Sequence, residues 1–276
     1  MGIKTKIDWC DSSWNPVTGC LHGCEYCYAR GITERFGGAC HVAPHYHDVE
    51  DPAENVGVIY EYSSGENHIL NQPYFDAKNE KVAPYPYFFD PTFHRYKLDE
   101  PQHWKKPRTI FVCSMADLFG KWVPDEWIQE VINACLAAPQ HRYLFLTKNP
   151  SRYMYLIDNG IIPENNPSIW LGSTATIPEQ EFFWSDNVNT FVSIEPILAP
   201  FEELKNTIGE AEFPNWIIIG AETGRRVNKV VPEKSWIMGI LEEAKKRNVP
   251  VFMKESLRNM MGNDFIQEFP WSIETH

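Results

Sequence analysis

The sequence predicts an α/β fold whose strands form a full or partial barrel of six to eight β/α units. From residue 108 onward, short apolar runs alternate with longer amphipathic stretches. Continuous apolar strands separated by helices indicate a parallel sheet covered on both faces. Each apolar run also ends in polar residues, and the carboxyl ends of barrel strands are where active sites lie. We therefore expect these polar ends to share one rim.

The individual elements follow from this alternation. Strands are expected at residues 109–113, 143–146, 169–171, 191–194, 216–219 and 251–253, with one more ahead of Cys20. Helices are expected at residues 28–36, 125–138, 150–159, 178–184, 201–208 and 233–247. The helix at 125–138 has Pro124 ahead of Asp125 and Glu126, which is typical of a helix that begins with acids in its first turn.

Residues 38–107 interrupt the alternation, because they contain many aromatic residues and prolines and few helix patterns. A stretch this long with no regular element is not an ordinary loop. We expect one domain, residues 1–276, in which 38–107 form an irregular insertion or lid over the barrel mouth, with a small hairpin around 58–62. The insertion contains Cys40, His41, His45 and His47. These could bind a second metal, although histidines in polar loops more often serve as hydrogen-bonding or surface residues.

Charge and cysteine content restrict the kinds of function. The chain has 276 residues, a formal net charge of −12 and seven cysteines. This charge argues against a broad basic face that tracks nucleic acid, but not against a nucleotide or a single base as ligand. An odd cysteine count fits a reducing cytoplasm, and no apolar run is long enough to cross a bilayer. We expect a cytoplasmic protein that does not bind membranes.

The segment Cys20-Leu-His-Gly-Cys24-Glu-Tyr-Cys27 places three cysteines within eight positions. Four thiolates normally hold one iron–sulfur cubane, so a loop that supplies three can bind three irons and leave the fourth open for chemistry. Gly19 and Gly23 allow the backbone to turn sharply around the first two cysteines. The sequence therefore predicts a [4Fe-4S] cluster bound by Cys20, Cys24 and Cys27.

Two other interpretations of the same cysteines stay open. A structural zinc site needs four N or S ligands, and Cys10, His22 or His41 could supply the fourth. The cysteines could also be small hydrophobic residues without ligands. Zinc ligands tend to come in two separated pairs, whereas the chain has no second C-x2-C motif.

The C-x3-C-x-aromatic-C pattern, with Tyr26 before the last cysteine, resembles the signature of the radical S-adenosylmethionine (SAM) superfamily. More of the chain is similar to a phage- and mobile-element-associated radical SAM-like family of unassigned function, and more distantly to spore photoproduct lyase. The similarity covers nearly the whole chain except residues 38–90. The segments that carry it are Trp14–Ala29, Phe93–Pro101, Phe111–Phe119, Leu146–Pro150, Ser193–Pro196, Gly220–Gly224 and Phe252–Lys254.

The resemblance implies an enzyme in which the amino and carboxylate groups of SAM chelate the open iron. A one-electron donor, such as a flavodoxin- or ferredoxin-like protein, reduces the cluster. SAM is then cleaved to methionine and a 5′-deoxyadenosyl radical, which removes hydrogen from a substrate. A nucleoside, a nucleotide or a nucleic-acid base is the first choice of substrate. The alternative is a non-catalytic zinc or iron–sulfur module that acts as a scaffold for a partner.

The resemblance also suggests roles for polar residues at the strand ends. Lys148 is expected to bind the SAM carboxylate, or else to be an ordinary surface lysine. Ser173 and Thr174 suit the ribose hydroxyls, and Tyr26 belongs to the cofactor-binding loop. The backbone at Gly220, with Glu222, is expected to approach adenine.

Three further residues are candidates for catalysis. Glu195 could pair with the SAM ammonium or ribose, or serve a structural turn with Pro196. Lys254 could meet an anionic substrate or the SAM carboxylate. Asp117 lies at a strand end and could instead cap the following helix. The aromatic residues between Tyr85 and Tyr96 could stack on a planar substrate or pack the insertion against the barrel.

Overall fold

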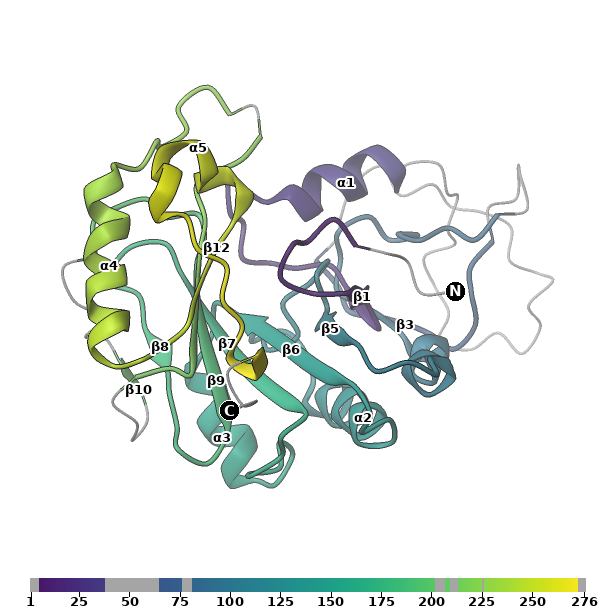
Figure 1. The fold of residues 1–276 in the computed structure, drawn as a ribbon. Helices are drawn as coiled ribbons and strands as arrows, with labels where there is room; N and C mark the ends of the chain where they lie inside the picture. Colours follow the sequence, from purple (N-terminus) through teal and green to yellow (C-terminus); the bar gives the residue numbers. More distant parts are fainter. Residues whose placement is uncertain are drawn as a thin grey trace.

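The centre of the protein is a parallel sheet that curls into a half-barrel (Figure 1). The computed structural model describes residues 5–37, 65–75, 81–201, 207–208, 213–224 and 226–272. Within these residues the sheet has seven strands in the order β1-β5-β6-β7-β9-β11-β12. They are β1 (Ser12–Trp14), β5 (Thr109–Val112), β6 (Arg142–Thr147), β7 (Ile169–Ala175), β9 (Asn189–Ile194), β11 (Trp216–Ile219) and β12 (Val251–Met253). The α/β prediction is confirmed, and the sheet is half of a barrel.

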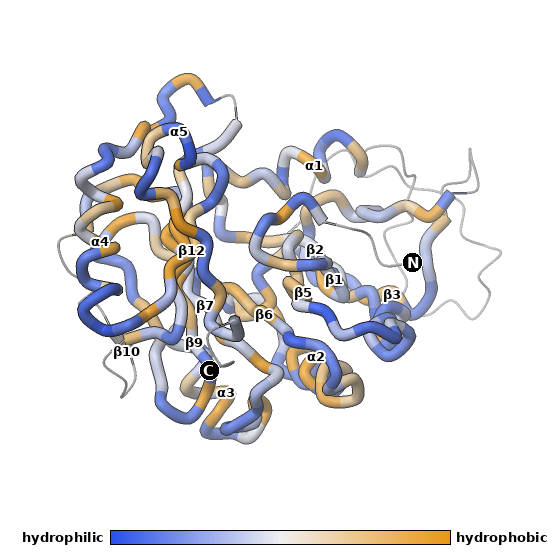
Figure 2. Tube along the Cα trace, in the orientation of Figure 1, coloured by the Kyte–Doolittle hydropathy of each residue, from blue (hydrophilic) through white to orange (hydrophobic). Residues whose placement is uncertain are grey.

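The outer face of this sheet is covered by α2 (Asp125–Leu136), α3 (Ser151–Asp158) and α4 (Lys234–Lys246) (Figure 1). Two further helices are α1 (Tyr28–Phe36), which follows the cysteine segment, and the short α5 (Arg258–Met261), which follows β12. Helices α2 and α3 pack against β5, β6 and β7 in one apolar cluster, and α4 packs against β9, β11 and β12 in another. Figure 2 shows hydrophobic strands in the middle and both kinds of residue along α4. Four of the six predicted helices are confirmed.

The predicted helix at 178–184 is wrong. Residues Phe182–Phe183 form a short strand, β8, which pairs with β10 (Thr207–Ile208). Phe182, Phe183 and Trp184 are all buried, and consecutive bulky aromatic residues favour an extended backbone that places side chains on both faces. In the helix predicted at 201–208, residues 207 and 208 are also in a strand, and residues 202–206 lie outside the described part of the chain.

Aromatic side chains fill the inner face of the half-barrel. Trp9 packs against Phe111, with ring centroids 4.6 Å apart, and against Phe191 and Trp216. Phe269 and Trp271, near the end of the chain, pack on the same cluster. The base of the half-barrel is therefore a packed aromatic core.

The region predicted as an irregular insertion contains regular structure. Strands β3 (His68–Leu70) and β4 (Thr92–His94) form a small sheet with β2 (Val17–Thr18). The 3₁₀ turns Arg95–Lys97 and Glu100–His103 follow, and others lie at Glu255–Leu257, Gly262–Asp264 and Pro270–Ser272. The hairpin expected around 58–62 and the possible metal ligands Cys40, His41, His45 and His47 lie outside the described residues.

None of the helices in the described ranges has both the length and the apolar character needed to span a bilayer.

Candidate functional site

A cavity of about 870 Å³ lies at the carboxyl ends of the strands, beside the cysteine loop (residues 20–27). Pockets for small molecules and cofactors usually measure about 300–1,000 Å³. Ten of the twelve predicted site residues line this cavity: Cys20, Cys24, Tyr26, Cys27, Asp117, Lys148, Thr174, Glu195, Glu222 and Lys254. The structure thus brings the cysteine loop and the polar strand ends together around one space.

Ser173 and Gly220 are the two that do not line it. Side chains alternate between the faces of a strand, so Thr174 faces the cavity while Ser173 faces the outer layer, where its hydroxyl accepts a hydrogen bond from the Phe183 N–H (2.9 Å). A Cβ on Gly220 would lie 3.0 Å from the Lys254 Cδ and 3.1 Å from the Glu195 Cγ. Gly220 therefore makes room for these two side chains.

The backbone of the cysteine loop is anchored at both ends. Gly19 has a φ of +88°, its N–H donates to the Met115 carbonyl (2.9 Å), and the Cys20 N–H donates to the Phe89 carbonyl (3.1 Å). At the other end Cys27 is the N-cap of α1, and its Sγ accepts the Arg30 N–H (3.4 Å). The Cys27 side chain therefore lies at the N-terminus of α1.

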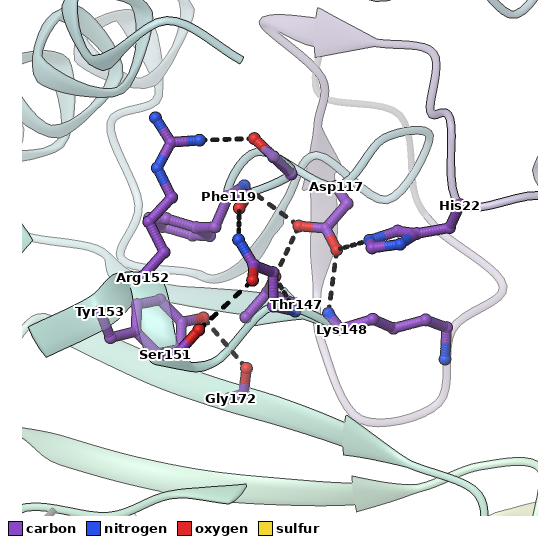
Figure 3. Close-up of polar contacts among 11 residues, drawn as sticks. His22, Asp117, Phe119, Thr147, Lys148, Ser151, Arg152, Tyr153 and Gly172 are labelled. Atoms are coloured by element: carbon purple, nitrogen blue, oxygen red, sulfur yellow. Dashed lines mark hydrogen bonds and ion pairs between the residues drawn. The ribbon is translucent and has the colours of Figure 1, made fainter. Parts of the chain in front are cut away.

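Asp117 ties this loop to β6 (Figure 3). Its carboxylate accepts hydrogen bonds from the His22 Nε2 (2.7 Å) and the Thr147 hydroxyl (2.7 Å). The backbone N–H groups of Lys148 (2.9 Å) and Phe119 (3.0 Å) also donate to it. Asp117 is not a helix cap, because the next helix, α2, begins at Asp125; its bond from Phe119 belongs to a local turn, and its other three bonds join separate segments. It holds the cysteine loop against the ends of β5 and β6.

Arg226 ties the other side of the loop to β11. Its Nε and Nη2 donate to the two carboxylate oxygens of Glu222 (2.7 and 2.8 Å), and its Nη1 donates to Glu25 (3.1 Å). These hydrogen bonds lower the pKa of Glu222. The Glu222 side chain is only 2% exposed, so this buried carboxylate has its charge balanced by a guanidinium in bidentate geometry.

Glu195 and Lys254 form an ion pair that spans the end of the strand between them. The Lys254 Nζ lies 2.5 Å from the Glu195 Oε1, and both side chains remain about a fifth to a quarter exposed. Glu195 follows β9 and Lys254 follows β12, and β11 lies between these strands. The two side chains therefore meet above Gly220, which directly follows β11, and form part of the cavity wall.

The three cysteines line the cavity from half-buried positions. Cys20 and Cys27 pack on an apolar cluster that contains Ala29, Phe89 and Met115. Burial raises the pKa of the Cys20 thiol to about 12, so this thiol becomes a ligand only when a metal displaces its proton. Among the described residues there is no group of three or more His, Cys, Asp or Glu side chains that could hold a metal ion.

Two of the three residues considered as a fourth zinc ligand make other contacts. The His22 imidazole is bound to Asp117, and the Cys10 Sγ lies 3.9 Å from the Ile7 carbonyl. His41 lies outside the described residues.

Sequence reasoning missed the residues that hold the loop in place. His22 was considered only as a zinc ligand, and Arg226 was not among the predicted site residues. Asn15 was also missed, although its Oδ1 accepts from the Ser114 hydroxyl (3.1 Å) and the Met115 N–H (3.0 Å). The available signal was that these residues lie within the segment Trp14–Ala29 or just after Gly220–Gly224. Their partners across the site could not be identified, because they are about 100 to 200 residues away in the sequence.

The polar members of the aromatic segment 85–96 have partners within the protein. His94 is fully buried and bonds to the Thr18 hydroxyl (2.9 Å), and Arg95 forms a bidentate ion pair with Glu130. Phe89, by contrast, lines the cavity. His94 and Arg95 therefore hold the segment against the rest of the protein, and Phe89 is a member of the segment that reaches the site.

A family model described as "Protein of unknown function (DUF5131)" matches residues 4–261. The chain belongs to this family. The match includes the cysteine loop, the strand ends and both anchoring networks. No curated protein and no solved structure matches the chain significantly.

Proposed function

We propose that this member of the family is a radical SAM enzyme, carrying a [4Fe-4S] cluster on Cys20, Cys24 and Cys27. One observation carries the proposal. The C-x3-C-x2-C loop lines a large cavity at the carboxyl edge of a parallel half-barrel, and its last cysteine caps a helix. This edge is where α/β barrels bind ligands and do chemistry.

The bound cluster and SAM supply a 5′-deoxyadenosyl radical once a one-electron donor, such as a flavodoxin- or ferredoxin-like protein, delivers an electron. The protein supplies binding, orientation and exclusion of water. Asp117 and Arg226 fix the loop from opposite sides, which sets where the thiolates point. Trp9 and Phe111 line the base of the cavity with apolar rings. These rings exclude water from that side of the site.

Several cavity residues are available to hold SAM. The Thr174 hydroxyl faces the cavity and suits a ribose hydroxyl, while the Glu195–Lys254 pair offers one charge of each sign. Glu195 can accept from the SAM ammonium, and Tyr26 lies within the loop beside the cluster. The substrate is a small molecule, with nucleosides, nucleotides and bases as first candidates.

Anaerobic reconstitution with iron and sulfide tests the proposal. We expect about four irons per chain and 5′-deoxyadenosine from SAM after reduction with dithionite. Cys24→Ala should lose both, whereas Cys10→Ser should retain both, because Cys10 lies outside the loop. A fully loaded protein that SAM does not perturb spectroscopically, and that forms no 5′-deoxyadenosine, would show a scaffold instead of an enzyme.

A further inference from the structure

The carboxylates that line the cavity are all paired. Among the described lining residues, Glu25 and Glu222 share Arg226, with nitrogen–oxygen distances of 2.7–3.1 Å. Asp117 is bound by His22 at 2.7 Å, and Glu195 by Lys254 at 2.5 Å. Each of these acids therefore already has a basic side chain as a partner.

Two lysines on the same cavity have no carboxylate partner within the described part of the chain. These are Lys148, which follows β6, and Lys6, in the segment ahead of β1. Lys148 touches Asp117 only through its backbone N–H, and its ammonium group points away from that carboxylate (Figure 3). The nearest described contact of this ammonium is the face of Tyr26, 5.4 Å from the ring centroid.

The contact with Tyr26 does not use the hydrogen-bonding capacity of Lys148. A cation–π contact is a weak attraction to the ring face, and an ammonium has three N–H donors. Lys148 is half-buried, so its charge is partly removed from water without a negative partner. An oxyanion in the cavity would supply that partner.

We propose that Lys148, assisted by Lys6, binds an oxyanion of the substrate, either a phosphate or a carboxylate. The inference rests on the proposed function, in which iron takes the carboxylate and amine of SAM and leaves no other cofactor anion for these lysines. Lysine acts as a point charge and does not impose the planar fork of arginine, so it suits both anions. Lys6 is exposed and should contribute less, because water and salt screen its charge.

Lysine labelling tests this assignment residue by residue. The full chain is treated with an amine-acetylating reagent at constant ionic strength, in the presence of phosphate, acetate or chloride, and acetylation is read by mass spectrometry. We expect phosphate or acetate to protect Lys148 strongly and Lys6 weakly, both with and without cluster and SAM. Lys245, exposed on the outer helix α4, is the matched control and should stay unprotected. The anion that protects better identifies the substrate group.

Binding of the better anion to variants gives the second measurement. Lys148→Gln keeps the backbone N–H bond to Asp117, so we expect it to fold normally and to weaken anion binding about tenfold. Lys6→Gln should weaken it about two- to threefold, and Lys245→Gln should have no effect.

Two results overturn the inference. One is equal anion binding by wild type and Lys148→Gln. The other is protection of Lys148 by SAM alone, with no further effect of anion, which would assign this lysine to the cofactor. Neither result depends on 5′-deoxyadenosine formation, so failure of the proposed function is detected separately.

Discussion

Replacing Gly19 by alanine tests whether the cysteine loop is held by the backbone contact just ahead of it. A Cβ at residue 19 would lie 2.0 Å from the Asp90 carbonyl oxygen and 2.7 Å from the Pro91 nitrogen. Both are backbone atoms, so no side-chain rotation relieves the clash. Gly19 also has a φ of +88°, a region that L-residues with a Cβ rarely adopt.

Gly23 provides a matched control within the same loop. Its φ is +70°, but an added Cβ would have no heavy atom of the described residues within 4 Å beyond its chain neighbours. Gly23→Ala should therefore be destabilised only by the strain of a left-handed backbone at a residue with a Cβ, about 1–2 kcal/mol. Gly19→Ala carries the same strain and, in addition, an overpacking cost of about 1–3 kcal/mol or more. We expect the two variants to differ in stability by about 2 kcal/mol.

The assay is thermal unfolding of the cluster-free protein, followed by iron content after reconstitution. A difference of about 2 kcal/mol corresponds to roughly 4–8 °C for a chain of this size. Because the Cys20 N–H bonds to the Phe89 carbonyl next to Asp90, displacement of that segment moves Cys20, and under the proposed function Gly19→Ala should also bind less iron. If the two variants unfold together and load iron equally, the clash is relieved elsewhere and the reasoning is refuted.

Three other perturbations address the networks around the loop. Asp117→Ala leaves two N–H groups and one hydroxyl without an acceptor and should lower the free energy of unfolding by about 3 kcal/mol. Urea unfolding measures this, and Asp117→Asn should recover part of the lost stability. Arg226→Ala leaves the Glu222 carboxylate unpaired and, in the same urea assay, should destabilise the fold more than Arg258→Ala, which removes one member of an exposed ion pair. Burial lowers the pKa of His94 to about 3, below its unfolded value of about 6.5. Below pH 6.5 only the unfolded chain gains this proton, so stability should fall by about 1.4 kcal/mol by roughly pH 5.5; parallel pH curves for wild type and His94→Gln would refute this.

The regular part of the fold could be predicted because each element has a local signal. Strands such as Trp216–Ile219 and Val251–Met253 are continuous apolar runs, and helices such as Lys234–Lys246 carry a periodic apolar face that packs on the sheet. Parallel strands place their carboxyl ends on one edge. The convergence of Asp117, Lys148, Glu195 and Lys254 on one cavity followed from this rule.

The faces of the side chains could not be predicted, because they depend on where each strand ends. The apolar run at 169–171 indicated a strand that stops before Gly172, whereas β7 continues to Ala175. Ser173 and Thr174 therefore lie inside a strand, on opposite faces. Thr190 and Ser193 on the neighbouring β9 pair with Leu171 and Thr174. Hydrogen bonding to β9 extends β7, and this partner is not visible in the local sequence.

Long-range partners account for the rest of what was missed, and they determine what the cysteine loop can do. The loop is held from three separate parts of the chain: by the Phe89 carbonyl, by Asp117 through His22, and by Arg226 through Glu25. His22 lies two residues before Cys24, and Glu25 follows Cys24 directly. Displacement of either strand end therefore moves Cys24 relative to the cavity. The proposed enzyme would need such connections to both halves of the sheet, because a bound cofactor must be held in a fixed position relative to its substrate.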